Sequence, residues 1–279
     1  MTDRSELRGR VALGTATLAI DEEERDHDAD VATIRAGLDA GFGIVDTARA
    51  YSRADDRFSG ERLTAEAVAG RDGVLVVTKG GHWREDRTTW KVDNHAARLR
   101  RDAEDSVRTL GVERLDVFLL HRADDRGAEL DESLDALLAL RADGIAELVG
   151  LSNVTAEQLE HAVARGAVDV VQNQHGVLTR DPDALAAAAA NGIPYFGYSP
   201  LRTGGVPLAE LFPRLGALAA ERGTPLPRLV LRGLLAESPV MSLVSGATRV
   251  ESVQDSAAAE HEPWDVTADE AYRTDMEDN

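Results

Sequence analysis

Residues 43–81 read GIVDTARAYSRADDRFSGERLTAEAVAGRDGVLVVTKGG and contain one complete strand–helix–strand unit. The short apolar runs Ile44–Thr47 and Val74–Thr78 predict two strands, and the helical pattern Gly60–Ala69 lies between them. This order is typical of two parallel strands joined by a crossover helix. The stretch therefore indicates an α/β protein built around a parallel sheet.

The same alternation continues through the rest of the chain. Eight short apolar runs predict strands, and they are spaced on average by roughly 35 residues, about the size of one βα unit. They are Val11–Thr15, Ile44–Thr47, Val74–Thr78, Asp116–Leu120, Leu148–Leu151, Val168–Gln172, Ile193–Tyr198 and Met241–Ser245. The helical patterns are Ala29–Ala40, Gly60–Ala69, Asn94–Leu110, Asp131–Asp143, Thr155–Arg165, Asp181–Ala190, Pro207–Arg222 with Leu226–Ala236 as one broken helix, and Val250–Ala259.

Eight such pairs in about 250 residues match the arithmetic of a (β/α)8 TIM barrel. A doubly wound open sheet is the alternative, but it favours a glycine-rich turn after an early strand, and Val11–Thr17 contains no G-x-G-x-x-G. No linker rich in proline or serine divides the chain, so we expect a single domain over residues 1–279. From about residue 261 we expect an acidic tail, His261–Asn279, that is solvated or partly disordered.

The composition excludes several classes of protein. The chain has 279 residues, 43% of them hydrophobic, which is enough to bury a core without a structural metal. It has no cysteine, and this excludes a disulfide scaffold and a cysteine nucleophile. The net charge of −19 (31 − 50) makes nucleic acid and anionic membranes poor partners. No apolar stretch approaches the ~18 residues of a membrane helix, and Met1–Arg10 lacks an apolar signal core, so we expect a cytoplasmic protein.

In such a barrel the active site lies at the carboxyl ends of the strands. Four side chains at these ends make a proton-transfer device: Tyr51 supplies a phenol, Lys79 an ammonium beside it, Asp46 a carboxylate that holds the ammonium, and His121 a group that polarises a carbonyl. The ammonium is expected to lower the pKa of the phenol. With no metal-ligand cluster in the sequence, we expect no metal, and a carbonyl reduction then needs its hydride from a bound cofactor.

These residues lie in motifs that resemble the aldo-keto reductase superfamily, of bacterial type, over nearly the whole chain. The matching stretches are Gly43–Ala48 followed by Tyr51, Ser59–Glu61, Val77–Gly81, Leu115–Asp116 leading to Leu119–Arg122, Gly150–Asn153, Gln172–Gln174 and Tyr198–Leu201. The resemblance implies NAD(P)H-dependent reduction of an aldehyde or ketone. It also implies a catalytic tetrad of Asp46, Tyr51, Lys79 and His121, with the tyrosine as the general acid.

The resemblance further implies a nicotinamide dinucleotide that lies extended across the barrel mouth. Ser152, Asn153 and Gln172 would hold its carboxamide, and Tyr198 would stack on its ring. Ser199, Leu201, Arg202 and Gly204 would follow the pyrophosphate, and Gly246, Thr248, Arg249, Ser252 and Ser256 would line the adenosine end. A guanidinium suits a phosphate, so Arg249 favours NADPH, with NADH as the alternative.

Short loops over the barrel mouth predict an open pocket for a small-molecule carbonyl. Ala16, where many family members carry tryptophan, would line it together with His82, Trp83 and Arg122. The Lys-Gly-Gly and His-Arg details resemble members that act on sugar-derived or pyridoxal-type carbonyls. Arg122 could instead form a salt bridge with an acid in its loop. For Arg49 and Trp90, the sequence does not decide whether they line the pocket or pack in the structure.

Two other functions remain open from the sequence. A barrel lysine with a nearby tyrosine and aspartate is also compatible with a Schiff-base aldolase that uses Lys79. The second alternative is a cofactor-binding regulatory subunit with little turnover, as some channel-associated members of the superfamily are; a missing tetrad residue would support it, and none is missing. The sequence assigns no oligomeric state.

Overall fold

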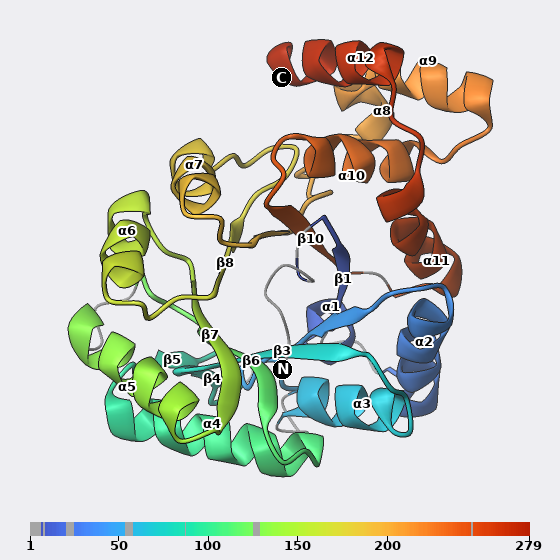
Figure 1. The fold of residues 1–279 in the computed structure, drawn as a ribbon. Coiled ribbons are helices and arrows are strands. Elements are labelled where there is room, and N and C mark those ends of the chain that lie inside the picture. Colours follow the sequence, from blue (N-terminus) through green and yellow to red (C-terminus); the bar gives the residue numbers. More distant parts are fainter. Residues whose placement is uncertain are drawn as a thin grey trace.

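Eight parallel strands close into a barrel in the computed structural model, which describes residues 7, 9–20, 25–53, 58–86, 88–124, 129–246 and 248–279. Their order around the barrel is β1, β2, β3, β6, β7, β8, β9 and β10, and β10 pairs with β1 to close it (Figure 1). The strands are β1 Val11–Gly14, β2 Ile44–Asp46, β3 Leu75–Gly80, β6 Leu115–Leu120, β7 Ala146–Ser152, β8 Val170–Gln174, β9 Tyr195–Tyr198 and β10 Met241–Gly246. Each predicted strand overlaps one of these, so the predicted (β/α)8 barrel is confirmed.

Helices surround the barrel, and a small hairpin follows β3 (Figure 1). The hairpin strands β4 His82–Arg84 and β5 Trp90–Val92 pair antiparallel outside the barrel sheet. The helices are α1 Ala16–Ala19, α2 His27–Asp39, α3 Ser59–Val68, α4 Ala96–Leu110, α5 Leu130–Ala142, α6 Ala156–Ala164, α7 Pro182–Ala190, α8 Leu208–Leu211, α9 Pro213–Arg222, α10 Leu226–Ala236, α11 Val250–Ala258, a 3-10 turn Ala259–His261 and α12 Val266–Glu277.

Local sequence signals set several helix ends. Helix α6 begins after Thr155, whose hydroxyl accepts from the Gln158 backbone N–H at 3.2 Å while the Gln158 side chain accepts from the Thr155 N–H at 2.9 Å. This reciprocal capping satisfies two N–H groups that a helix start leaves open. Helix α4 ends at Gly111, whose φ of 70° is readily adopted by glycine.

The barrel interior holds its own apolar core beneath the site. Its buried side chains are Leu7, which precedes β1, and residues at alternate positions of the strands: Ala12, Ile44, Val77, Val117, Leu119, Leu148, Val170, Phe196 and Val244. Because strand side chains alternate between faces, the residue two positions further along points the same way. Toward the carboxyl ends, those next inward positions are Asp46, Lys79, His121, Gln172 and Tyr198. The strand period therefore gathers the predicted site residues into one layer above the apolar core.

The C-terminal segment differs from the expected solvated tail. Residues 266–277 form α12, which packs against α9 and α10 (Figure 1). Tyr272 is only 3% exposed, and its ring stacks on Phe212 with centroids 5.9 Å apart. Although the segment is acidic on average, Trp264, Ala268 and Tyr272 follow one another at intervals of four residues and form one apolar helix face.

The expected broken helix over residues 207–236 is divided into three pieces. Pro213 lies in the first turn of α9 and Pro227 in the first turn of α10. A proline lacks the N–H that would continue a preceding helix, so each one marks a new helix start. The piece before Pro213 is the short helix α8.

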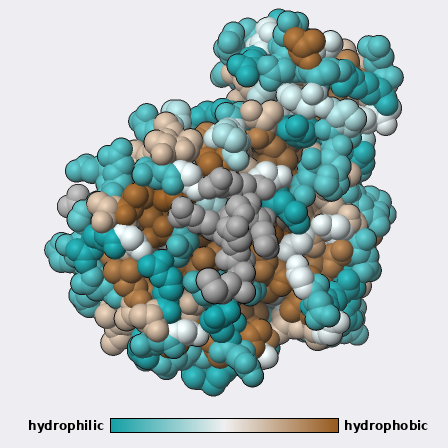
Figure 2. All heavy atoms as spheres, viewed as in Figure 1, coloured by the Kyte–Doolittle hydropathy of each residue, from teal (hydrophilic) through white to brown (hydrophobic). Residues whose placement is uncertain are grey.

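The outer surface is mostly hydrophilic where α9 and α12 project from the barrel, at the upper right of Figure 2. This is consistent with the acid excess of the chain. Among the described residues, no helix combines the length and the apolar character that a bilayer span requires.

The docking of α12 generates a stability prediction. Asp275 is fully buried and accepts from the backbone N–H groups of Arg214 and Leu215, the latter at 2.9 Å, at the start of α9. We expect Asp275→Ala to lower the free energy of unfolding by about 1–3 kcal/mol, because it leaves these buried donors without a partner. Urea denaturation followed by circular dichroism measures the change.

The matched control is Asp278→Ala. Asp278 pairs with the same arginine at 2.7 Å, but its side chain is 62% exposed, and an exposed ion pair contributes at most about 1 kcal/mol. Equal losses in the two variants would contradict the capping role of Asp275.

Candidate active site

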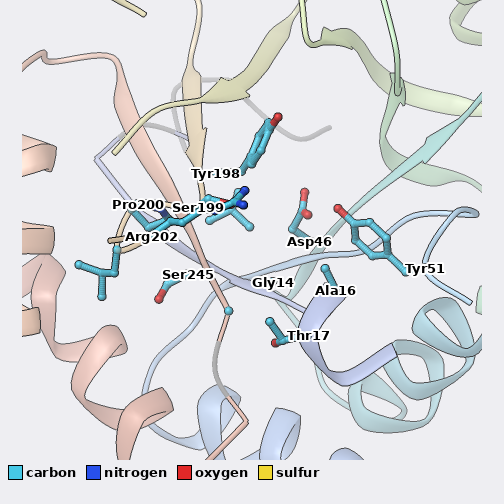
Figure 3. A pocket seen from close by; sticks show the side chains of 13 residues that line it. Gly14, Ala16, Thr17, Asp46, Tyr51, Tyr198, Ser199, Pro200, Arg202 and Ser245 are labelled. Atoms are coloured by element: carbon cyan, nitrogen blue, oxygen red, sulfur yellow. The ribbon is translucent and has the colours of Figure 1, made fainter. Parts of the chain in front are cut away.

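The inward-pointing polar layer places the four predicted catalytic residues together. Asp46 ends β2, Lys79 lies in β3, and His121 directly follows β6. Tyr51 follows β2 by one turn, and its backbone N–H donates to the Ala48 carbonyl at 3.0 Å. In Figure 3, Asp46 and the Tyr51 hydroxyl point into the same cavity.

Lys79 is the centre of this group. Its side chain is fully buried, and its ammonium donates to Asp46 Oδ1 at 2.7 Å, to the Thr47 carbonyl at 2.9 Å and to the Tyr51 hydroxyl at 3.4 Å. The three N–H groups of an ammonium therefore have three acceptors. Since one of those acceptors is the phenol, the lysine both orients Tyr51 and places positive charge beside its oxygen.

Gln172 takes a role that the sequence reasoning missed. Its Nε2 donates to Asp46 Oδ2 at 2.7 Å, and the predicted contact of Gln172 with a nicotinamide carboxamide stays a prediction. Both carboxylate oxygens of Asp46 are thus engaged, one by Lys79 and the other by Gln172. The strand pattern predicts that Gln172 on β8 points into the barrel across from Asp46 on β2. It does not predict which group the Gln172 amide bonds to.

The pKa of Tyr51 is raised, whereas we expected the Lys79 ammonium to lower it. Burial raises the pKa of the Tyr51 phenol well above its usual value, and the negative charge of Asp46 raises it further, as does Tyr198. The expected lowering by the Lys79 ammonium does not prevail, because burial disfavours the charged phenolate and the Asp46 carboxylate repels it as well. A raised pKa favours the protonated form of the phenol.

His121 is neutral in this environment. Burial lowers its pKa well below the usual value, and the positive charge of Lys79 adds to the effect, followed by His82 and Arg122. Its ring meets the Tyr51 ring edge-on, with centroids 5.8 Å apart. A neutral imidazole beside a protonated phenol provides two groups able to hydrogen-bond one carbonyl oxygen.

Asn153 and Tyr198 hold each other at the end of β7 and β9. The Tyr198 hydroxyl donates to Asn153 Oδ1 at 2.7 Å, and Asn153 Nδ2 donates to the His121 carbonyl at 2.9 Å. Both Asn153 and Ser199 have left-handed backbones, with φ of 59° and 56°. Such conformations are uncommon outside glycine and tend to lie at functional sites. Ser152, which precedes Asn153, is buried in the same layer.

A cavity of about 350 Å³ opens beside this group. It is lined by the carboxyl ends of β1, β2, β9 and β10, with Asp46 and Tyr51 at one end (Figure 3). Of the predicted site residues, its lining includes Ala16, Asp46, Tyr51, Tyr198, Ser199, Leu201, Arg202 and Gly246. An elongated ligand that enters beside Tyr198 would therefore meet Ser199 and Arg202 further along.

A second cavity of about 290 Å³ continues from the first, because both are lined by Leu201, Ser245 and Gly246. It contains the remaining predicted residues of the adenosine end, Thr248, Arg249, Ser252 and Ser256. Ser245 and Ser256 share a buried hydrogen bond of 3.0 Å. Ala247 lies outside the described residues.

Basic charge in the second cavity is unevenly distributed. Arg228 pairs with Asp255 at 2.5 Å and with Glu262 at 3.5 Å, so acids already neutralise its charge. The contact of Arg249 is with a neutral group, the Ser252 hydroxyl at 3.4 Å. Arg249 is the better placed of the two to meet an anion.

The hairpin β4–β5 places two of the predicted substrate residues, His82 and Trp83, on opposite faces. The Arg98 guanidinium lies 3.7 Å above the Trp83 ring. Strand alternation places Trp83 on the face of β4 opposite His82, and its role in a substrate pocket stays a prediction. His82 instead contacts His121, with ring centroids 4.9 Å apart. Arg122 forms a two-bond pair with Asp124, both bonds at 2.8 Å.

Arg49, which the sequence left open, lies in the core behind the site. Its guanidinium pairs with buried Glu61 at 2.6 Å and stacks on the Phe58 ring at 3.4 Å. Its backbone N–H donates to the Lys79 carbonyl at 3.0 Å. Arg49 is a packing residue that fixes the segment between Asp46 and Tyr51.

Comparison with known proteins identifies the family. The pattern of the aldo/keto reductase family matches residues 10–271, so the chain belongs to this family of NAD(P)H-dependent oxidoreductases. Pyridoxine 4-dehydrogenase of Escherichia coli is 29% identical over 242 residues, 85% of this chain and 82% of that protein. The NADH-specific methylglyoxal reductase of Escherichia coli is 24% identical over 269 residues, 81% of each chain.

Among solved structures, an aldo/keto reductase from Klebsiella pneumoniae, in complex with NADP and acetate, superposes with a TM-score of 0.78. It is 27% identical, and the match covers 95% of this chain and 91% of that one. The family resemblance inferred from the sequence is confirmed.

The pKa of His121 predicts a pH dependence of stability. Unfolded histidine binds a proton below about pH 6.5, whereas folded His121 stays neutral because burial lowers its pKa. Its contribution to the free energy of unfolding is therefore fully present above about pH 6.5 and is lost progressively as the pH falls toward the folded pKa. We expect His121→Gln to reduce the slope of stability against pH between about pH 7 and pH 5 by up to ~1.4 kcal/mol per pH unit.

Urea denaturation at a series of pH values gives this slope for each variant. His161→Gln is the control, since the side chain of His161 is 48% exposed and lies on outer helix α6. A wild-type slope retained in His121→Gln would show that the ring is not held neutral.

Proposed function

We propose that this protein reduces a small polar aldehyde or ketone to the corresponding alcohol with NADPH, with Tyr51 as the proton donor. The observation that carries the proposal is the hydrogen-bonded line from Gln172 through Asp46 and Lys79 to the phenol. It ends on a protonated hydroxyl at the wall of a cavity, beside a neutral imidazole.

The proposed chemistry follows from these groups. The dinucleotide, when bound, supplies a hydride to the carbonyl carbon. Tyr51 gives its proton to the carbonyl oxygen, which His121 polarises by a hydrogen bond, and the product is an alcohol. Lys79 stabilises the phenolate that remains, and Asp46 keeps the ammonium charged and in place. Solvent then returns a proton to the phenolate.

The two joined cavities fit an extended dinucleotide. Tyr198 lines the first cavity beside Asp46 and Tyr51, where a flat ring is able to stack on a nicotinamide. Arg202 lies further along the first cavity and Arg249 in the second, and guanidinium groups suit the pyrophosphate and a 2′-phosphate. The Klebsiella pneumoniae relative with NADP supports this choice, while the NADH-specific methylglyoxal reductase keeps NADH as the competing cofactor.

The aldolase alternative receives less support from the site. Burial lowers the pKa of Lys79, as a Schiff-base lysine requires, although the charge of Asp46 opposes this shift. A nucleophilic amine, however, needs a free lone pair directed at the substrate. The Lys79 nitrogen is fully buried and already directed at three acceptors, which suits a charge that tunes another group.

Removing the phenol hydroxyl tests the proposal directly. Tyr51→Phe is expected to lower kcat/KM with NADPH and small aldehydes by about 10²- to 10⁴-fold, the usual share of a general acid. NADPH affinity should stay within a few-fold, because the phenol acts on the substrate. Absorbance at 340 nm follows turnover, and fluorescence titration follows cofactor binding. Lys79→Met should likewise impair turnover far more than folding.

Other outcomes point to the other functions. Unimpaired reduction by Tyr51→Phe would remove Tyr51 as the acid. Wild-type protein that binds NADPH tightly but reduces no member of a broad carbonyl panel would indicate a regulatory subunit. Borohydride trapping of a substrate on Lys79, without cofactor consumption, would indicate an aldolase.

Cofactor choice is tested at the second cavity. We expect Arg249→Ala to weaken NADPH binding by about 10- to 100-fold, since a charge-assisted hydrogen bond contributes about 1.5–3 kcal/mol. NADH, which has no 2′-phosphate, should lose far less. The matched control is Arg228→Ala, which should affect both cofactors alike because Asp255 and Glu262 neutralise that arginine. Equal losses of NADPH and NADH in Arg249→Ala would refute the phosphate contact.

A further inference from the structure

The loop that joins β8 to α7 contacts one wall of the first cavity. Residues 198–200 belong to the lining of this cavity and are called the wall segment (Figure 3). The backbone N–H of His175 donates to the Tyr198 carbonyl at 3.2 Å, and the backbone N–H of Val177 donates to the Pro200 carbonyl at 3.0 Å. Both ends of the wall segment are therefore held by the backbone of this loop.

The loop and the wall segment approach each other so closely that glycine is required between them. A Cβ on Gly176 would lie 2.4 Å from the Pro200 carbonyl oxygen, and a Cβ on Gly197 would lie 3.0 Å from the His175 carbonyl oxygen. Ser199, within the wall segment, has a left-handed φ of 56°. Such a conformation persists only where the surroundings fix the residue. The shape of the wall segment consequently depends on the position of the loop.

The imidazole of His175 fixes the loop in place. Its side chain is only 1% exposed, and a buried imidazole needs a partner for each nitrogen. Nδ1 accepts from the Asp181 backbone N–H at 3.3 Å, so Nε2 is the donor, and it donates to Glu237 Oε2 at 3.0 Å. The ring also meets the Tyr195 ring edge-on, with centroids 5.6 Å apart. His175 therefore ties the loop to the start of α7 and to the end of α10.

Glu237 connects the same loop to the C-terminal helix. It directly follows α10, and its side chain is 13% exposed. Besides the bond from His175, its carboxylate accepts from the Tyr272 hydroxyl on α12 and pairs with Arg180 at 2.5 Å. One carboxylate thus joins α10, α12 and the loop after β8. Its contacts continue through His175 to the backbone of the wall segment.

We propose that His175 and Glu237 are positioning residues that hold the wall segment where Tyr198 contacts the nicotinamide of the bound cofactor. The inference rests on the proposed function, because it concerns the affinity of the same cofactor site. Neither residue is among those that line the first cavity, so both act through the backbone of the wall segment. NADPH and NADH share the nicotinamide, and loss of either residue therefore weakens both cofactors alike. Tyr51 keeps its contact with Lys79.

The test measures the dissociation constants of NADPH and NADH by fluorescence titration of the folded protein. His175→Phe fills the space but removes both side-chain hydrogen bonds. It should raise both constants by roughly 3- to 10-fold, the size expected of a residue that acts on a ligand through its neighbours. The kcat at saturating cofactor should stay within about two-fold, so the KM for the cofactor changes instead. His175→Gln, whose amide is able to donate to Glu237, should restore part of the affinity.

Glu237 provides the second half of the test. Glu237→Ala should weaken both cofactors as His175→Phe does, and the double variant should lose no more than either single variant, because the two residues act through one contact. Glu237→Gln keeps the volume and one accepting oxygen, so it should show a smaller loss, and it supplies the measurement if Glu237→Ala does not fold.

Asp275→Ala is the matched control. Asp275 also lies on α12, but it bonds to the start of α9, so this variant should lower stability and keep the wild-type dissociation constants. Equal weakening in Asp275→Ala would overturn the inference, since the loss would follow from destabilisation alone. Wild-type constants in His175→Phe and in the Glu237 variants, or a loss confined to NADPH, would also overturn it while leaving carbonyl reduction intact. Wild-type protein that binds neither cofactor would instead overturn the proposed function, and the inference with it.

Discussion

The ion pair between Lys79 and Asp46 is the constraint on which the site depends. Both side chains are almost completely buried in the barrel, where desolvation of two charges costs more than a simple ion pair recovers. The cost is limited because Gln172 and the Thr47 carbonyl satisfy the remaining donors and acceptors. A buried ion pair of this kind adds little to the free energy of unfolding. Its position beside the phenol gives it a reason to be retained.

The rarity of lysine fits this interpretation. The chain has 31 basic residues, of which only Lys79 and Lys91 are lysines, leaving 29 arginines (31 − 2). A guanidinium is a planar fork that bridges separated acceptors, as Arg49 does between Glu61 and Asp105. An ammonium is a point charge whose donors start from one atom, so it reaches a carboxylate, a carbonyl and a phenol that converge on it. The geometry around Lys79 therefore requires lysine.

Strand periodicity explains how much of the site could be predicted from sequence. Asp46 and Lys79 could be located because each lies at the carboxyl end of a predicted strand. In the structure, the strand period places each of them two positions beyond an inward apolar residue, Ile44 or Val77. The direction of the Tyr51 pKa was not predictable in the same way, because it depends on the balance of burial, Asp46 and Lys79. These terms are fixed only by three-dimensional distances.

Contacts between separate segments could not be predicted either. The sequence places Trp83 near the site because it follows β3, but it does not show that Trp83 lies in a new strand, β4, under the Arg98 guanidinium. The tail was taken as solvated because its charge is acidic. Tyr272 and Trp264 nevertheless bury it against α9 and α10, since a few apolar side chains at the right spacing outweigh the average composition.

The left-handed residue Asn153 lies in a hydrogen-bond network that joins several strands across the barrel mouth. Asn153 keeps its left-handed backbone because its N–H donates to the Gln172 carbonyl at 3.0 Å and its side chain bonds to both Tyr198 and His121. Strain of this kind persists only where the surroundings fix the residue from several sides. Gln172 in turn holds Asp46, so hydrogen bonds connect β9, β7, β8 and β2 across the barrel mouth. One set of hydrogen bonds therefore positions both Tyr198, which we propose to stack on the nicotinamide, and Asp46, which holds Lys79.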